Sequence, residues 1–174
     1  MMMRILFVSE ASDGGSPRSQ RELARHLVAR GHVLQFLVTE KRPPRATAWF
    51  YGQLSDLSVR LRGRAGAELV ARVRDSCGQH THTTEVEGLP HRIAPLVQNA
   101  LPEVIKTFRP DVVVANSVER WAWRRIHAVC RAARIPTVLY VREDDSLRHL
   151  ESGAVPDLLV ANAESLAESL RRQG

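Results

Sequence analysis

Short apolar runs and stretches with apolar residues at helical spacing follow one another along the chain. They predict strands and helices in turn. Residues 4–8 and 33–38 are apolar runs too short for a helix, as is typical of strands buried on both faces. The segment between them carries apolar residues at helical spacing, at Leu23, Ala24, Leu27 and Val28. Ser16 can cap this helix, Pro17 suits its first position, and Gly31 stops it. A strand, helix, strand unit is therefore predicted at the start of the chain.

The same alternation continues after an irregular region. Residues 83–93 alternate around Gly88-Leu89-Pro90, which predicts a short β-excursion with a turn. Apolar residues from Val97 to Phe108 then mark a helix that Pro102 must kink or start afresh, and Arg109-Pro110 ends it. Strands are expected at 111–115, 136–141 and 157–161, with a helix at 119–133 whose apolar face holds Ala122, Ile126, Val129 and Ala133, and a final helix capped by Asn162. This pattern predicts an α/β fold, a Rossmann-like parallel sheet with helices on both faces, in a single domain spanning residues 1–174.

The irregular region, from residue 41 to about 82, is expected to hold one or two helices. Apolar residues recur there at near-helical spacing, and the same region carries a basic stretch that includes Arg60, Arg62, Arg64, Arg72 and Arg74. A basic amphipathic segment can lie on a membrane surface, whereas a solvated face over a core stripe is the commoner outcome. Both interpretations stay open.

The charge and composition of the chain limit the classes of partner that are expected to bind it. The chain has 25 basic and 19 acidic residues, and a net charge of +6 suits anionic partners such as a sugar nucleotide, a lipid phosphate, a membrane surface or nucleic acid. A solvated, arginine-rich surface, or one half of a protein whose other half is more acidic, is the alternative. The chain has no zinc-finger spacing and no block of five basic residues, so nucleic acid is not expected as a partner. No apolar run reaches 18 residues, and a soluble, cytoplasmic protein is expected, with peripheral contact at the inner face of the membrane as the open alternative.

Sulfur and imidazole groups give no metal signature. Cys77 and Cys130 lack any metal-ligand spacing and are expected to be free, buried thiols. His80 and His82 are interpreted as loop residues rather than ligands, because no further partners are spaced around them. We expect no metal site and no cofactor.

The first predicted strand leads through Gly14 and Gly15 directly into the helix. Glycines let the backbone approach a ligand, and the free N–H groups of a first helical turn attract groups such as a diphosphate. The spacing matches neither a dinucleotide fingerprint nor a P-loop. Gly14, Gly15, Ser16 and Arg18 are therefore candidate substrate-binding residues, with an ordinary turn as the alternative.

Several phrases resemble the N-terminal domain of the retaining glycosyltransferases of the GT-B fold, in the group (glycosyltransferase family 4, or group 1) that includes phosphatidylinositol mannosyltransferases and sucrose synthases. The opening strand, Gly14-Gly15 and Arg30-Gly31-His32-Val33 are similar to the family's opening. Its central Pro-Asp-Val-Val phrase appears as Pro110-Asp111-Val112-Val113, followed by Ala115-Asn116-Ser117. Ile135-Pro136 and the segment 156–166 are similar to its later strand entry and closing segment. The resemblance covers nearly the whole chain, in the same order.

The resemblance implies a nucleotide-sugar-dependent transferase with its active site between two domains. This domain would bind a sugar or lipid-linked acceptor and line one wall of the cleft, with Asn116 and Ser117 as further candidate binding residues. A C-terminal domain, in cis or in trans, would bind the nucleotide sugar, and transfer would need no metal. On this interpretation the full-length enzyme is a hexosyltransferase used in polysaccharide biosynthesis. The isolated domain is expected to be inactive.

One segment departs from the family pattern. Many relatives carry a histidine after the fifth strand, where this chain has Arg142, Glu143 and Asp144. Arg142 suits an anionic acceptor or phosphate, and the two carboxylates can accept sugar hydroxyls or act on the acceptor proton. These three are the candidate catalytic residues, with an ion pair that organises a loop as the alternative. Two other functions also stay open: half of a GT-B sugar-nucleotide epimerase, and a non-catalytic binding subunit that works with a separate donor-binding chain.

Overall fold

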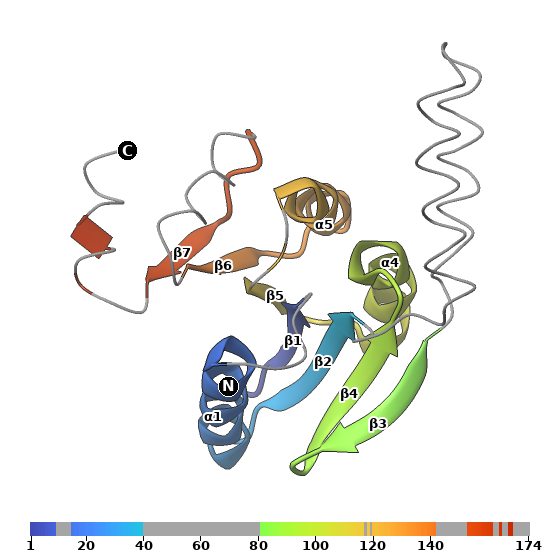
Figure 1. Ribbon diagram of the computed structural model, residues 1–174, viewed down its shortest axis with the longest axis vertical. Helices are drawn as coiled ribbons and strands as arrows, with labels where there is room; N and C mark the ends of the chain where they lie inside the picture. The colour runs from blue at the N-terminus through green and yellow to red at the C-terminus, as the bar shows by residue number, and fades with distance from the viewer. Residues whose placement is uncertain are drawn as a thin grey trace.

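The computed structural model describes residues 1–9, 15–39, 81–116, 118, 120–141, 153–161, 164 and 167–168. Within these ranges lies a seven-stranded sheet in the order β3-β4-β2-β1-β5-β6-β7 (Figure 1). All neighbouring pairs are parallel except β3 with β4. The strands are β1 (Arg4–Ser9), β2 (Val33–Thr39), β3 (His82–Val86), β4 (Leu89–Ala94), β5 (Val112–Asn116), β6 (Thr137–Val141) and β7 (Leu158–Ala161).

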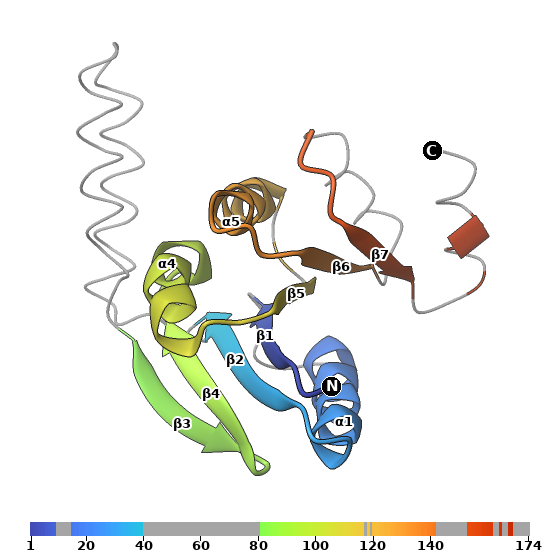
Figure 2. The same ribbon diagram turned by 180° about the vertical axis from the view of Figure 1, so that it is seen from behind.

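Helices cover both faces of the sheet. Helix α1 (Gly15–Ala29) lies on one face, and α4 (Val97–Phe108) and α5 (Arg120–Ala132) lie on the other (Figures 1 and 2). Successive residues of the central strands point to opposite faces, and both sets are buried: Leu6 and Val8 join the α4 and α5 side, and Ile5 and Phe7 the α1 side. Burial on both faces explains the continuous apolar runs. The predicted Rossmann-like α/β fold is confirmed.

The buried face of α1 differs from the predicted stripe. Ala24 is fully buried and Leu27 packs beside it, but Leu23 and Val28 are 40% and 47% exposed. Gln20, one helical turn before Ala24, is buried instead. The helix thus meets the sheet along a narrow strip, which apolar spacing alone cannot distinguish from its flanks. It also begins at Gly15, so Ser16 lies inside the first turn and not before it.

The helices on the other face follow the prediction more closely. Helix α4 runs through Pro102 without a second start and ends at Arg109, which adopts the left-handed conformation. In α5, Ala122 and Ile126 are fully buried and Val129 is partly buried, as predicted.

Two positions of α5, and Ala133 just after its end, differ from the face predicted for this helix. Ala133 is exposed, while Trp123 and Cys130 are fully buried. The Trp123 indole N–H donates to the carbonyl of Ala154, 2.8 Å away, which explains how so large a ring is buried with its polar atom satisfied.

A tight hairpin forms the outer edge of the sheet. Its turn falls at Glu87-Gly88, both with positive φ (54° and 78°), one residue earlier than the predicted Gly88-Leu89-Pro90. Hairpin turns whose backbone twist matches that of the flanking strands have positive φ at both central residues. His82 is the exposed first residue of β3, so its placement in a loop was wrong. Glu87 accepts from Arg25 and lies 3.5 Å from Arg21 Nε, which ties the hairpin to α1.

Two Pro-Asp pairs fix the amino edge of the sheet. The Asp111 carboxylate accepts the backbone N–H of Arg4 at 2.7 Å, and Asp157 accepts that of Thr137 at 2.7 Å. Each carboxylate thereby satisfies the first residue of the neighbouring strand, β1 or β6. These hydrogen bonds hold the pKa of Asp157 below its usual range. The Pro110-Asp111 and Pro156-Asp157 pairs thus have a structural role, at the edge opposite the carboxyl ends of the strands.

Candidate functional site at the carboxyl edge of the sheet

The carboxyl ends of β1, β5 and β6 meet along one edge of the sheet. Ser9, the last residue of β1, is in register with Asn116, the last of β5, and Asn116 is in register with Tyr140 of β6. In open parallel sheets, ligands bind outside this edge. The structure therefore places Asn116, a predicted binding residue, on the edge where ligands are expected.

The polar side chains at this edge are enclosed rather than open. Ser9 and Asn116 are each 1% exposed, and neither is without a partner. Buried polar groups are costly unless hydrogen-bonded, so these two residues define the shape of the edge. Asn116 is better suited to holding the β5 terminus in place than to direct contact with a large substrate.

Three helices begin at the same edge. Helix α1 follows β1, α4 follows β4 and α5 follows β5, so their amino ends share the carboxyl side of the sheet (Figure 1). Gly15 is the first residue of α1, and Arg18 is an exposed residue of its first turn. Free N–H groups and a cationic side chain at this position attract anionic groups. Gly15 and Arg18 thus lie where a phosphate-bearing substrate would need them.

The structure adds two polar residues that the sequence pattern did not single out. Gln98, in the first turn of α4, is 1% exposed, and its Oε1 has no partner among the described residues. Thr39, the last residue of β2, likewise has a buried hydroxyl without a partner in the described ranges. A glutamine inside the apolar stripe between Val97 and Leu101 was the available signal. Such groups call for hydrogen-bond partners.

The remaining predicted site residues lie outside the described residues. These are Gly14, Ser117 and the three candidate catalytic residues, Arg142, Glu143 and Asp144. The side chain of Ser16 is also not described, and the same holds for Cys77, His80, Asn162 and the basic stretch at 60–74. Their assigned roles stay predictions.

No described side chains form a metal centre or a reactive thiol. In the ranges that the structure covers, no three His, Cys, Asp or Glu residues are grouped closely enough to hold an ion. Cys130 is a free, buried thiol, as predicted, and its burial, followed by the charge of Asp157, raises the pKa to about 12. A thiol with that pKa stays protonated at neutral pH and is a poor nucleophile. Among the described helices, none is long and apolar enough to span a membrane.

Comparison with known proteins gives a fold but no family. No known protein family and no curated protein matches the chain. Solved structures of an alpha-glucosyltransferase do match. The one in complex with UDP-glucose and DNA containing an abasic site has 13% identity and a TM-score of 0.54, over 94% of this chain and 36% of that one.

A second structure of an alpha-glucosyltransferase agrees with the first. It is in complex with UDP and a 13-mer DNA, with 12% identity and a TM-score of 0.52 over 92% of this chain and 38% of that one. At this identity the likeness concerns the fold alone. The chain has the Rossmann-like architecture of one half of a GT-B protein, and it spans less than two fifths of the length of these structures.

Proposed function

We propose that this chain is the acceptor-side domain of a nucleotide-sugar-dependent glycosyltransferase. It binds a sugar or lipid-linked acceptor along the carboxyl edge of its sheet and forms one wall of the active-site cleft. A C-terminal domain, in cis or in trans, binds the nucleotide sugar. The observation that carries the proposal is the similarity of the sheet to two alpha-glucosyltransferase structures solved with UDP or UDP-glucose.

The carboxyl edge has features that suit this chemistry. Three helix amino ends point to it, and Arg18 adds an exposed positive charge beside one of them. Transfer from a nucleotide sugar leaves a diphosphate, and helix ends and cationic side chains stabilise developing negative charge without a metal ion. Arg142, Glu143 and Asp144 directly follow β6 and would therefore enter the cleft at the same edge.

The acceptor is proposed to be a glycan or a lipid-linked sugar, not nucleic acid. The two similar structures hold DNA, but this chain has no continuous block of five basic residues. A transfer assay with the chain joined to its donor-binding domain separates these cases. Radiolabelled UDP- and GDP-sugars are offered with oligosaccharide, polyprenyl-phosphate-linked sugar or duplex DNA acceptors. Label in a glycan or lipid acceptor supports the proposal, and label in DNA alone contradicts it.

The role of Arg142 has its own test. In the two-domain enzyme, Arg142→Ala should lower kcat/KM at least about a hundredfold, because one charge-stabilising contact of a transition state contributes roughly 2.7–4 kcal/mol. The midpoint of thermal unfolding should stay close to that of the wild type. Arg124→Ala, an exposed arginine of α5, is the matched control. Wild-type kinetics in Arg142→Ala would remove Arg142 from the site.

A further inference from the structure

A cavity lies at the amino edge of the sheet, opposite the candidate site. It has a volume of about 590 Å³ and is lined by residues at the end of α5, at the start of β6 and just before β7. Since β6 has five residues, its amino end is about 13–16 Å from the carboxyl edge. Small-molecule sites have volumes of roughly 300–1,000 Å³. The cavity is thus of suitable size for an organic ligand and is separate from the proposed transfer site.

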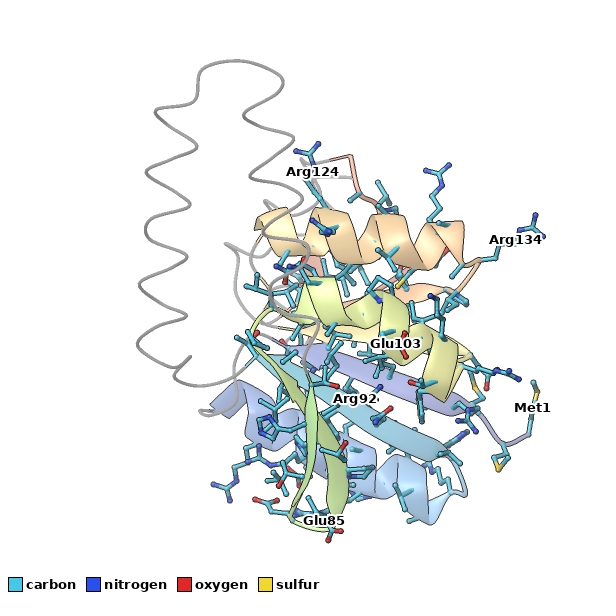
Figure 3. The ribbon with its side chains drawn as sticks, turned by 90° about the vertical axis from the view of Figure 1, so that its right-hand side faces the viewer. Met1, Glu85, Arg92, Glu103, Arg124 and Arg134 are labelled. Carbon is cyan, nitrogen blue, oxygen red and sulfur yellow. The ribbon has the colours of Figure 1, made fainter. Side chains whose placement is uncertain are left out.

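The lining combines basic and apolar side chains. Arg131 and Arg134 come from the last turn of α5 and the residues after it, and His127 adds a ring nitrogen one helical turn earlier. Figure 3 shows Arg134 beyond the end of α5, with Arg124 nearer the beginning of the helix and outside the lining. Planar guanidinium groups bind phosphate oxygens through paired hydrogen bonds.

The segment before β7, which lines part of the cavity, is held in place by hydrogen bonds. The Trp123 indole fixes the carbonyl of Ala154, so that Val155 next to it faces outward with 65% exposure. Asp157 is fixed by Thr137, whose backbone N–H and hydroxyl both donate to Oδ2, at 2.7 and 3.0 Å. Both donors reach the same carboxylate oxygen, so within the part of the chain that the structure describes, Oδ1 can accept a hydroxyl group of a ligand. A preformed wall lowers the ordering cost of binding.

Two sources of negative charge at the cavity oppose anion binding. Each carries less charge than Arg131 and Arg134 together. The carboxyl end of a helix carries about half a negative charge. Here three of its last carbonyls accept the N–H groups of Ala133, Arg134 and Ile135, which reduces their exposure to a ligand. Asp157 contributes one negative charge against two from Arg131 and Arg134. The cavity therefore remains net positive.

We propose that this cavity is a binding site for a phosphate monoester of a small polyhydroxy compound. Arg131 and Arg134 bind the phosphate, Asp157 accepts a ligand hydroxyl, and Val155 with Ile135 contacts the carbon chain. A bare phosphate would fill only a small part of 590 Å³, which favours a ligand with an organic portion. The proposal rests on the cavity alone and is independent of the sugar-transfer reaction.

The test is calorimetric titration of the 174-residue chain with glycerol 3-phosphate, with inorganic phosphate and with glycerol. Glycerol 3-phosphate should bind more tightly than phosphate, and glycerol should not bind. Arg131→Gln and Arg134→Asn should each weaken binding about tenfold or more, because each removes charge-assisted hydrogen bonds. Asparagine tolerates the left-handed backbone at position 134, where φ is 56°, so this variant should keep its fold.

Matched variants separate a built site from general positive charge. Arg124→Gln removes an arginine of the same helix outside the cavity, and Arg109→Asn repeats the left-handed substitution at the end of α4; both should bind like the wild type. Val155→Glu places a carboxylate in the cavity at an exposed position and should abolish binding. The proposal is overturned if glycerol 3-phosphate fails to bind at several millimolar, or if Arg124→Gln weakens binding as much as Arg131→Gln. Binding only to vesicles that contain phosphatidic acid, and not to the free ester, would also overturn it.

Discussion

At the scale of single residues, His91 is a buried ionisable group whose protonation affects the fold. It ends a row of three rings that crosses β1, β2 and β4 beneath α1. Phe7 stacks on Phe36 with ring centroids 5.0 Å apart. Phe36 stacks on His91 with ring centroids 4.5 Å apart and an angle of 4° between the ring planes. His91 is 5% exposed and its Nδ1–H donates to the carbonyl of Leu89. Burial, the largest cause, lowers the pKa of His91 below its ordinary value of 6.5.

This shift predicts a loss of stability in mild acid. Because the folded pKa is lowered, the unfolded chain binds the proton more readily, and the His91 contribution is complete above pH 6.5 and is lost as the pH falls below it. His91→Phe keeps the stacked row and removes the proton, at a cost of about 1 kcal/mol for the lost hydrogen bond. Urea unfolding between about pH 5 and 7.5 should show a shallower acid decline in the variant. Equal slopes in the two proteins would contradict this account.

Arg109 and Arg134 both adopt left-handed backbone conformations at the ends of helices. Such a conformation costs a non-glycine residue roughly 1–2 kcal/mol, whereas glycine adopts it freely. Arg109→Gly should therefore raise the free energy of unfolding by about 0.5–1 kcal/mol, after the greater chain entropy of glycine is deducted. Arg124→Gly, inside α5, should lower it by about 1 kcal/mol. Thermal unfolding of both variants checks the contrast, and destabilisation at both positions would refute it.

At the scale of elements, the turn between β3 and β4 has a conflict between conformation and charge. Glu87 occupies a position with φ of 54° that favours asparagine before Gly88, but its carboxylate pairs with Arg21 and Arg25 of α1. The side chains of Glu87 and Arg25 are 46% and 53% exposed, and exposed pairs contribute only about 0–1 kcal/mol. Glu87→Asn should therefore leave stability unchanged or raise it by up to about 1 kcal/mol. A loss above about 1 kcal/mol in urea unfolding would show that the ion pairs dominate.

The Pro-Asp pairs predict a different element-scale effect. Asp111→Ala removes the acceptor for the N–H of Arg4 at the start of β1, and should lower the free energy of unfolding by about 1 kcal/mol. Glu103→Ala, at an exposed position of α4, should change it by less than about 0.5 kcal/mol. Amide exchange measures the local consequence, since the Arg4 amide should lose protection in Asp111→Ala alone. Unchanged protection there would contradict the assigned role of Asp111.

The elements of this fold were largely predictable, because strands buried on both faces produce apolar runs that end where the strands end. The predicted strand at 33–38, for example, differs from β2 by one residue. The buried face of α1 was less predictable. Gln20 is buried and Leu23 is exposed, because the position of the sheet decides which side chains of the helix it covers. Likewise, the Thr137–Asp157 contact at the cavity joins the start of β6 to a residue 20 positions later, just before β7, and no local spacing reveals it.

At the scale of the whole molecule, the chain has the architecture of one half of a GT-B protein and spans less than two fifths of the two similar glucosyltransferase structures. In the proposed division of labour, this half holds the acceptor and the other half holds the nucleotide sugar. The candidate site was predictable in its location, at the carboxyl edge of the sheet, because parallel strands bring their ends together. Its enclosed polar residues, such as Gln98, depend on packing and were not predictable.

The central claim is tested most directly by calorimetric titration with UDP- and GDP-sugars of the 174-residue chain alone and of the same chain joined to its donor-binding domain. The proposed division predicts tight, stoichiometric binding only in the joined protein, with the chain alone binding at least about a hundredfold more weakly, equivalent to roughly 2.7 kcal/mol. Tight, stoichiometric binding to the chain alone would place the donor site in this domain and would contradict the proposed division.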